Sequence, residues 1–241
     1  MSEQCIQVKN LTKSFSGRKV INDLSFEVNK GEVFALLGHN GAGKSTTIDL
    51  ILGLKCPDEE NATILGMDAA KHRKNVFEKV GVQLQHTEYQ NMMTVEEACI
   101  EYASLYKKPS DYKKLLHSFG LSDLKKSYIN KLSGGEKQKL SVVLALIGNP
   151  EIVFLDELTT GLDVAARREV WRTLKHLKEK GLTIFLTTHY MEEAQALCDH
   201  VCIIKSGEKV IEGTIAEIVN ASGKTALEEA YLYFMGEEDL L

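Results

Sequence analysis

The segment EVFALLGHNGAGKSTTIDLILGL, residues 32–54, decides the interpretation of the whole chain. Its first part, Val33–Leu37, is an unbroken apolar run, which is typical of a parallel strand covered on both faces. Residues 38–45 then fit the pattern G-x-x-x-x-G-K-[ST] at every position, and apolar residues follow at helical spacing up to Leu52. The segment therefore predicts a strand, a loop and a helix, in this order.

The loop has the residue types that bind a nucleoside triphosphate. Gly38, Gly41 and Gly43 let the backbone turn tightly and approach a bulky anion, while loop N–H groups and the helix N-terminus point at phosphate. Lys44 supplies a cation that can reach the β- and γ-phosphates, and the Ser45 hydroxyl can bind the accompanying Mg²⁺. Because a strand precedes the loop and a helix follows it, phosphate binding is favoured over an ordinary glycine-rich turn.

Composition and charge exclude several classes of protein. The 241 residues are enough for one large α/β domain or for a domain with an inserted lobe. A net charge of −5 argues against wrapping nucleic acid, which needs a basic face. The polar N-terminus has no signal-peptide core, and no apolar run is long enough to span a bilayer. Five cysteines without a C-x-x-C pair suit reduced thiols in the cytosol, so we expect any membrane role to come through a partner.

The pattern along the chain predicts a sheet subdomain and an inserted helical lobe. Alternation over residues 6–28 indicates antiparallel strands beside the main sheet, and residues 79–85 indicate a further strand. Residues 56–61 are expected to form a polar loop. The composition then changes, and we expect helices over residues 87–150, beginning with a T-x-x-E capping box at Thr94. Further capping boxes are predicted at Thr214 with Glu217 and at Thr225 with Glu228.

A second candidate site is the apolar strand EIVFLDE, residues 151–157. Asp156 stands at its carboxyl end, where ligands bind in open parallel sheets, and an acid there can hold Mg²⁺, usually through water. Glu157 is placed to orient or deprotonate water. The alternative is a strand that ends in solvated acids, and the phosphate loop elsewhere in the chain favours catalysis.

A third candidate site is LSGGE, residues 132–136. Ser133 and Glu136 match a capping box at the start of an apolar helix, and two glycines expose backbone N–H groups between them. This arrangement is a second anion cradle in the same chain. The residues alone do not separate it from an ordinary helix N-cap with flexible glycines.

Taken together, these motifs resemble those of ATP-binding cassette (ABC) transporter ATPases. The phosphate loop, Gln85, LSGGE, FLDE at 154–157, GLD at 161–163 and His189 occur in the order of that family, and the resemblance covers nearly the whole chain. Residues 188–214 resemble the corresponding sequence in the subgroup of these ATPases that serves multidrug, antibiotic and related exporters.

The resemblance implies the fold and the partners. It implies an α/β P-loop fold with a RecA-like, mostly parallel core over residues 1–86 and 151–217, including an N-terminal antiparallel β subdomain. A helical subdomain spans 87–150 and a helical tail spans 218–241. It also implies ATP and Mg²⁺ as cofactors, and a second ATPase subunit, identical or different, that closes head to tail around two ATP molecules. A separate membrane permease is the other partner, with the chain on the cytoplasmic face and export as the direction.

The resemblance also implies the roles of single residues. Glu157, His189 and Gln85 would be catalytic, and Ser45, Gln85 and Asp156 would face the metal. The nucleotide-binding residues implied by the resemblance are Phe15, Gly38, His39, Asn40, Gly41, Ala42, Gly43, Lys44, Ser45, Thr46, Ser133, Gly134, Gly135 and Asp163. Of these, Phe15 would stack on adenine, Ser133 and Gly135 would contact the partner's γ-phosphate, and Asp163 would bridge the subunits.

Several positions depart from the family pattern, among them Glu59-Glu60 where a Ser-Gly turn is common and Leu144 where many members have arginine. Phe15 stands where tyrosine is usual, Leu158 where proline usually follows the catalytic acid, and Glu136 where glutamine is commoner. Two other hypotheses remain: a soluble cassette ATPase acting on DNA or the ribosome, and a nucleotide-dependent regulatory module without turnover. The first usually has a long coiled-coil insert or two cassettes, which the sequence does not show, and the second needs an impaired Glu157 or LSGGE helix.

Overall fold

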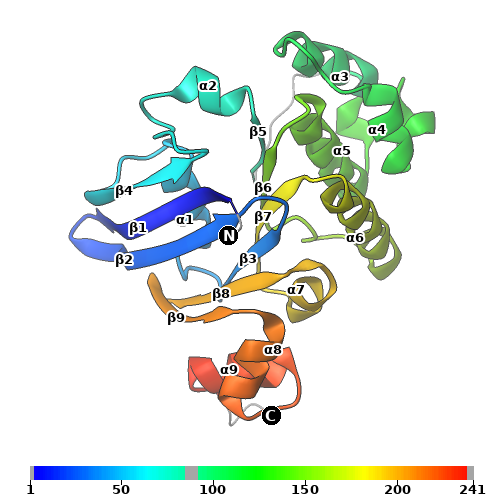
Figure 1. Ribbon diagram of the computed structural model, residues 1–241. Helices are drawn as coiled ribbons and strands as arrows, with labels where there is room; N and C mark the ends of the chain where they lie inside the picture. Colours follow the sequence, from blue (N-terminus) through cyan, green and yellow to red (C-terminus); the bar gives the residue numbers. More distant parts are fainter. Residues whose placement is uncertain (1–2, 85–91, 238–241) are drawn as a thin grey trace. The chain divides into compact units, whose positions relative to one another are not determined.

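A computed structural model describes residues 3–84 and 92–237 of the chain (Figure 1). The chain divides into two compact units. The first contains residues 1–76 and 185–241, and the second contains residues 77–184. In the described residues, no helix is both long and apolar enough to cross a membrane.

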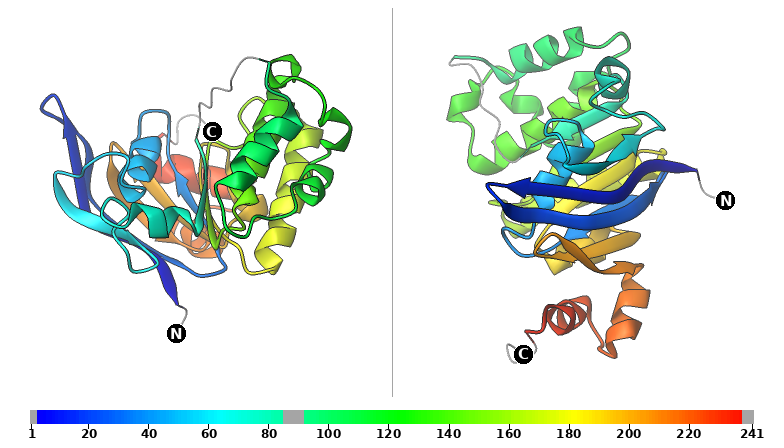
Figure 2. Two further views of the ribbon diagram at one scale, coloured as in Figure 1. Left: turned by 90° about the horizontal axis from the view of Figure 1, so that it is seen from above. Right: turned by 90° about the vertical axis from the view of Figure 1, so that its left-hand side faces the viewer.

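The first unit begins with an antiparallel sheet in the order β2-β1-β4 (Figures 1 and 2). Its strands are β1 (Gln4–Phe15), β2 (Arg18–Asn29) and β4 (Glu59–Ile64). Ile6, fully buried, pairs with Val28 on one side and with Ile64 on the other, so the period-two pattern places this apolar face in the core. The predicted antiparallel strands are confirmed.

The polar loop expected over residues 56–61 is wrong in its second half, because β4 starts at Glu59. Glu59 lies opposite Thr12 of β1, so cross-strand pairing outweighs the low β-propensity of glutamate at this position.

The rest of the first unit is built on β3 (Val33–Leu37), all five residues of which are buried, as expected. It pairs in parallel with β8 (His200–Lys205), and β8 pairs antiparallel with β9 (Glu208–Gly213). β7 (Thr183–Thr188), whose last four residues belong to this unit, lies on the other side of β3. Stacked rings join this sheet to the antiparallel one, with the Phe34 centroid 5.1 Å from that of Phe26 and 5.6 Å from that of Phe185.

The described part of the first unit also contains helices. They are α1 (Lys44–Ile51), α2 (Arg73–Phe77, which ends at the unit boundary), α7 (Met191–Leu197), α8 (Ile215–Ser222) and α9 (Leu227–Met235). The capping box at Thr214 with Glu217 is confirmed at the start of α8. The predicted box at Thr225 with Glu228 is wrong: Ala226 is the N-cap of α9, and the Thr225 hydroxyl donates to Glu229 at 2.9 Å. The helix starts one residue later than the pattern indicated.

The second unit pairs two parallel strands and carries the helical lobe. β5 (Val80–Gln83) pairs with β6 (Ile152–Asp156), with Val80 opposite Ile152. The helical segments are α3 (Val95–Ser104), α4 (Tyr112–Ser118), the 3₁₀ turns Ser122–Leu124 and Ile129–Lys131, α5 (Gly134–Ile147) and α6 (Val164–Glu179). The capping box at Thr94 is confirmed. The predicted subdomain boundaries remain a prediction.

Candidate nucleotide-binding site

The predicted phosphate loop connects β3 to α1, as the sequence indicated. Gly43 is the N-cap of α1 and adopts φ 109°, and Gly41 adopts φ 83°, both in the left-handed region that favours glycine. A Cβ atom at Gly38 would lie 2.8 Å from the Ile204 carbonyl oxygen of β8, so a side chain is excluded there. Open space surrounds the exposed Gly41, which leaves room for an anion over the loop.

Lys44 is folded over the loop that precedes it. Its Nζ donates to the carbonyl oxygens of Gly38 at 2.9 Å and His39 at 3.2 Å, and the residue is only 4% exposed. The lysine charge is thus placed at the loop. Ser45 and Thr46 follow in the first turn of α1, both half-buried, whereas the side chains of His39 and Asn40 are exposed on the loop.

The turn between β8 and β9 braces the phosphate loop, which the sequence did not predict. Gly207 donates its N–H to the Ala42 carbonyl at 2.9 Å and accepts from the Asn22 N–H at 3.0 Å. A Cβ atom at Gly207 would collide with the Val20 carbonyl oxygen, and its φ is +82°. Ser206-Gly207 reads as a plain hairpin turn in the sequence, so nothing local signals this second role.

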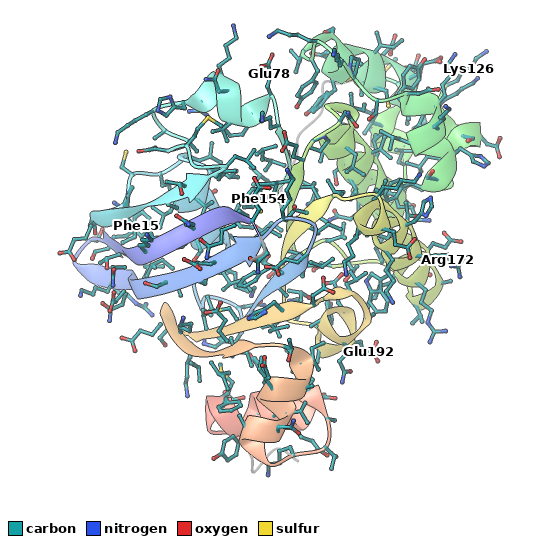
Figure 3. The ribbon with its side chains drawn as sticks, viewed as in Figure 1. Phe15, Glu78, Lys126, Phe154, Arg172 and Glu192 are labelled. Atoms are coloured by element: carbon teal, nitrogen blue, oxygen red, sulfur yellow. The ribbon has the colours of Figure 1, made fainter. Side chains whose placement is uncertain are left out.

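Phe15 lies at the end of β1, in the same unit as the phosphate loop (Figure 3). A Cβ atom at Gly43 would lie 2.6 Å from Ile21 Cδ1, so the loop packs directly on β2. In the register of the two strands, Ile21 is opposite Lys13, two residues before Phe15. The Phe15 side chain is 40% exposed, which suits a stacking platform.

His189 directly follows β7 and is half-buried in the first unit. Its ring centroid lies 4.1 Å from that of Tyr190, at an interplanar angle of 38°. The backbone N–H of Tyr190 donates to the Thr188 hydroxyl at 3.0 Å and fixes the chain as it leaves the strand. These contacts give the imidazole a defined position, and its contact with a γ-phosphate stays a prediction.

In the second unit, the two predicted acids end β6 and start a tight turn. Asp156 is the last residue of the strand and is 3% exposed. Glu157 adopts φ +50°, in the left-handed region, which is strained for a residue with a side chain. The Thr160 N–H donates to the Glu157 carbonyl at 3.2 Å, and Leu158 is buried. The turn is therefore held by these contacts, without the usual proline.

The LSGGE segment starts α5 in the predicted way. Ser133 is the N-cap, its Oγ accepts from the Glu136 N–H at 3.2 Å, and the Glu136 carboxylate accepts from the Ser133 N–H at 2.7 Å and hydroxyl at 2.8 Å. These hydrogen bonds, above all the one from the Ser133 N–H, lower the pKa of Glu136. Ser133 and Gly134 are exposed, with open space beside Gly134. The helix start is thus open to a ligand from outside the unit.

The start of α6 lies against the start of α5. A Cβ atom at Gly135 would lie 3.1 Å from Leu162 Cδ2. The next residue, Asp163, caps α6 by accepting the Ala166 N–H at 2.9 Å, and it is exposed. The two helix N-termini, both of which were predicted to face a second subunit, are therefore assembled within one unit.

The structure divides the predicted residues between the units. Phe15, the phosphate loop and His189 belong to the first unit, and Asp156, Glu157, the LSGGE segment and Asp163 belong to the second. Gln85 lies outside the described residues. Sequence reasoning missed Gln83, which is 2% exposed at the end of β5 and whose Nε2 donates to the Leu84 carbonyl at 2.8 Å. A glutamine inside an apolar strand was the available signal.

The residues present fit the predicted cofactors. The open space over Gly41 and the Lys44 ammonium at the loop suit a triphosphate. Each unit has one hard oxygen group of the kind that Mg²⁺ prefers: the Ser45 hydroxyl in the first unit and the Asp156 carboxylate in the second.

Comparison with known proteins identifies the family. The model of the ABC transporter family matches residues 21–160. The Nod factor export ATP-binding protein I of Burkholderia lata is 38% identical over 213 residues, which are 86% of this chain and 70% of that protein. The protein of the same name from Rhizobium johnstonii is 38% identical over 218 residues, which are 88% of this chain and 70% of that protein.

Solved structures agree in fold. An ATP-binding subunit of an ABC transporter has a TM-score of 0.88 at 30% identity, covering 96% of this chain and 99% of that one. A dimeric ATP-binding cassette bound to ADP and Pi, at 24% identity, shares the fold with a TM-score of 0.78 over 87% of this chain and 98% of that one. The predicted P-loop fold is confirmed. The chain, with ATP and Mg²⁺ as its cofactors, therefore belongs to the ABC transporter family as an ATP-hydrolysing subunit.

Proposed function

We propose that the first unit binds one ATP molecule through Phe15 and the phosphate loop. Phe15 receives adenine on its exposed ring, an interaction of roughly 1–3 kcal/mol by analogy with bases on aromatic side chains. The loop N–H groups and the N-terminus of α1 hold the phosphates, and Lys44 shifts from its loop carbonyls towards them. His189 donates a hydrogen bond to the γ-phosphate.

Together with His189, the catalytic residues are Glu157 and Gln85. Glu157 orients and deprotonates the attacking water. Its backbone has a φ of +50°, a strained conformation of the kind that occurs at functional sites. Ser45, Asp156 and Gln85 would hold Mg²⁺, which supplies charge neutralisation for phosphoryl transfer. The domain limits of 87–150 for the helical subdomain and 218–241 for the tail belong to the same proposal.

A second subunit completes each site across a head-to-tail dimer. The observation that carries this proposal is the exposed start of α5: Ser133 and Gly134 face open space at a helix N-terminus, where backbone N–H groups supply about half a positive charge. The chain already has the phosphate loop for its own nucleotide, so this second anion cradle serves a phosphate that another subunit holds. Asp163, exposed at the adjacent helix start, contacts that subunit.

The dimer powers export through a separate permease on the cytoplasmic face of a membrane. The names of the relatives from Burkholderia and Rhizobium describe export ATP-binding proteins, which supports export by this chain. They also favour transport over the two alternatives, a soluble cassette ATPase on DNA or the ribosome and a regulatory module without turnover. Either identical or different cassettes could form the dimer, and the experiment below separates these cases.

The test is Glu157→Gln in the purified chain. We expect the variant to bind ATP, to lose turnover and to elute as an ATP-dependent dimer in size-exclusion chromatography, because the carboxylate that activates water is gone and the closed state persists. Glu151→Gln, directly before the same strand, is the matched control and should keep turnover. A monomer that binds ATP would indicate a different partner cassette, whereas wild-type turnover by Glu157→Gln would refute the catalytic assignment.

A further inference from the structure

We infer that Lys13 and Lys55 are positioning residues that hold the Phe15 ring in the plane that receives the base. The inference rests on the proposed function, since it deepens the role given there to Phe15. Both ammonium groups lie over this ring, with Nζ of Lys13 5.5 Å and Nζ of Lys55 5.4 Å from its centroid. These distances are within the range of about 6 Å for cation–π attraction.

The ring needs such support because little else restrains it. Phe15 is 40% exposed at the last position of β1, followed by the Ser16-Gly17 turn, in which both residues have positive φ. Its side chain has no hydroxyl through which a hydrogen bond could fix it. An exposed side chain that must be ordered when a ligand binds weakens that binding, so fixing the ring beforehand strengthens it.

Lys13 is itself held in place by Asp58. Its Nζ forms an ion pair with Asp58 at 2.7 Å, and only 17% of the lysine side chain is exposed. Asp58 in turn accepts the Ser14 N–H at 2.6 Å and donates its own N–H to the Thr12 carbonyl at 2.9 Å. Asp58 is therefore tied to β1 at several points, so the position of the Lys13 ammonium follows that of the strand.

Lys55 is held from the other direction, by the helix that begins at the phosphate loop. Its Nζ pairs with Asp49 of α1 at 2.9 Å. The Asp49 carbonyl also accepts the N–H groups of Leu54 at 2.8 Å and Lys55 at 3.1 Å. One end of α1 thus carries the phosphate loop and the other carries the lysine over Phe15. The helix links the position of the base platform to that of the phosphate cradle.

We call this group of residues the base clamp. It consists of the Phe15 ring, the lysines Lys13 and Lys55, and the carboxylates Asp58 and Asp49 that pair with them. Each carboxylate fixes an ammonium, and each ammonium restrains the ring. This clamp strengthens binding of a ligand that stacks on Phe15 and leaves binding through phosphates alone unchanged. That difference separates a clamp from a general attraction of lysines for anions.

The experiment compares ATP with inorganic tripolyphosphate, which has phosphates but no base. For Lys13→Met and Lys55→Met we expect the Kd of Mg·ATP, measured by displacement of a fluorescent ATP analogue, to rise about two- to fivefold each. The Kd of tripolyphosphate should stay constant. Lys→Arg at either position should restore ATP binding, because a guanidinium also stacks over an aromatic ring.

Lys71→Met is the matched control, because Lys71 of the same unit also pairs with an aspartate, Asp68, at 3.1 Å. This substitution removes one positive charge and one ion pair without changing the surroundings of Phe15. It should therefore leave the ratio between the Kd of ATP and the Kd of tripolyphosphate unchanged. The inference would be overturned if the Lys13 and Lys55 variants bound ATP and tripolyphosphate with equally weakened affinity, or if neither affinity changed.

Phe15→Ala separates this inference from the proposed function. If Phe15→Ala leaves the Kd of ATP unchanged, the base does not stack on Phe15 and the proposed site fails. If Phe15→Ala weakens ATP but the lysine variants do not, the site stands and the clamp alone is refuted. When the clamp exists, Lys55→Met has no further effect on ATP binding in the Phe15→Ala background.

Discussion

Leu162 packs against Gly135, so the residue before the cap of α6 touches the glycine at the start of α5. The Leu162 Cδ2 atom is 3.1 Å from where a Cβ atom of residue 135 would lie, and Leu162 is 7% exposed. One turn further along, Lys139 of α5 forms an ion pair with Glu169 of α6 at 2.8 Å. The two helix starts that we propose face a second subunit therefore support each other.

We predict that Gly135→Ala lowers the free energy of unfolding by about 1–3 kcal/mol and reduces ATP turnover, because the new methyl group presses on Leu162. The double variant with Leu162→Val should recover part of both losses, since a smaller side chain relieves the pressure. Gly134→Ala is the control for stability, because open space surrounds that residue. Urea unfolding and a phosphate-release assay measure the two effects. Wild-type stability of Gly135→Ala would show that Leu162 moves freely.

We predict that a glycine at position 157 is more stable than an alanine by about 1 kcal/mol, because the φ of +50° strains any residue with a Cβ atom. Both variants lack the carboxylate and should be equally inactive. At Lys175, an exposed position inside α6, the order of stability should be reversed. There we expect the alanine variant to be more stable than the glycine variant by about 0.5–1 kcal/mol. Denaturant unfolding of the four variants tests this. Equal stabilities at position 157 would mean that the turn relaxes.

We predict that Gly207→Ala destabilises the chain by about 1–3 kcal/mol more than Gly66→Ala, and that it weakens ATP binding. Both glycines have positive φ, but only the Cβ atom of residue 207 would collide with the Val20 carbonyl. The collision would also disturb the hydrogen bond from the Gly207 N–H to Ala42 in the phosphate loop. Thermal unfolding and ATP titration are the measurements. Equal effects of the two substitutions would show that the contact between Gly207 and the phosphate loop contributes no measurable stability.

We predict that acid weakens the fold through the capping boxes. The Ser133 N–H lowers the pKa of Glu136, and the Thr94 N–H does the same for Glu97. A carboxylate with a lowered folded pKa contributes stability above its unfolded pKa, near 4.5, and loses it as the pH falls through the folded value. Glu136→Gln should therefore be less stable than wild type at pH 7, and this difference should shrink towards pH 3.

The same experiment has an internal check. Glu97→Gln removes a carboxylate from a different helix, so the effects of the two substitutions on the free energy of unfolding should add. A difference between Glu136→Gln and wild type that is constant from pH 7 to pH 3 would show that the capping carboxylate does not titrate with folding.

The sequence alone determined those features that depend on neighbours in the chain. The phosphate loop, the strand before it and the helix after it follow from one segment, and the capping boxes at Thr94, Ser133 and Thr214 follow from residues three apart. Such hydrogen bonds form within one helical turn, so the residue types and their spacing are sufficient. The failure at Thr225 shows the limit, because a shift of one residue in the helix start exchanged Glu228 for Glu229.

Only the tertiary structure decided the contacts that support the site. Gly207 reaches Ala42 because β8 lies beside β3, and Lys55 reaches Phe15 because the loop after α1 folds back to β1. The strain at Glu157 likewise follows from the turn that its neighbours impose. These contacts join residues far apart in the sequence, and their free energy is gained only after the whole chain has closed its loops, so no local pattern records them.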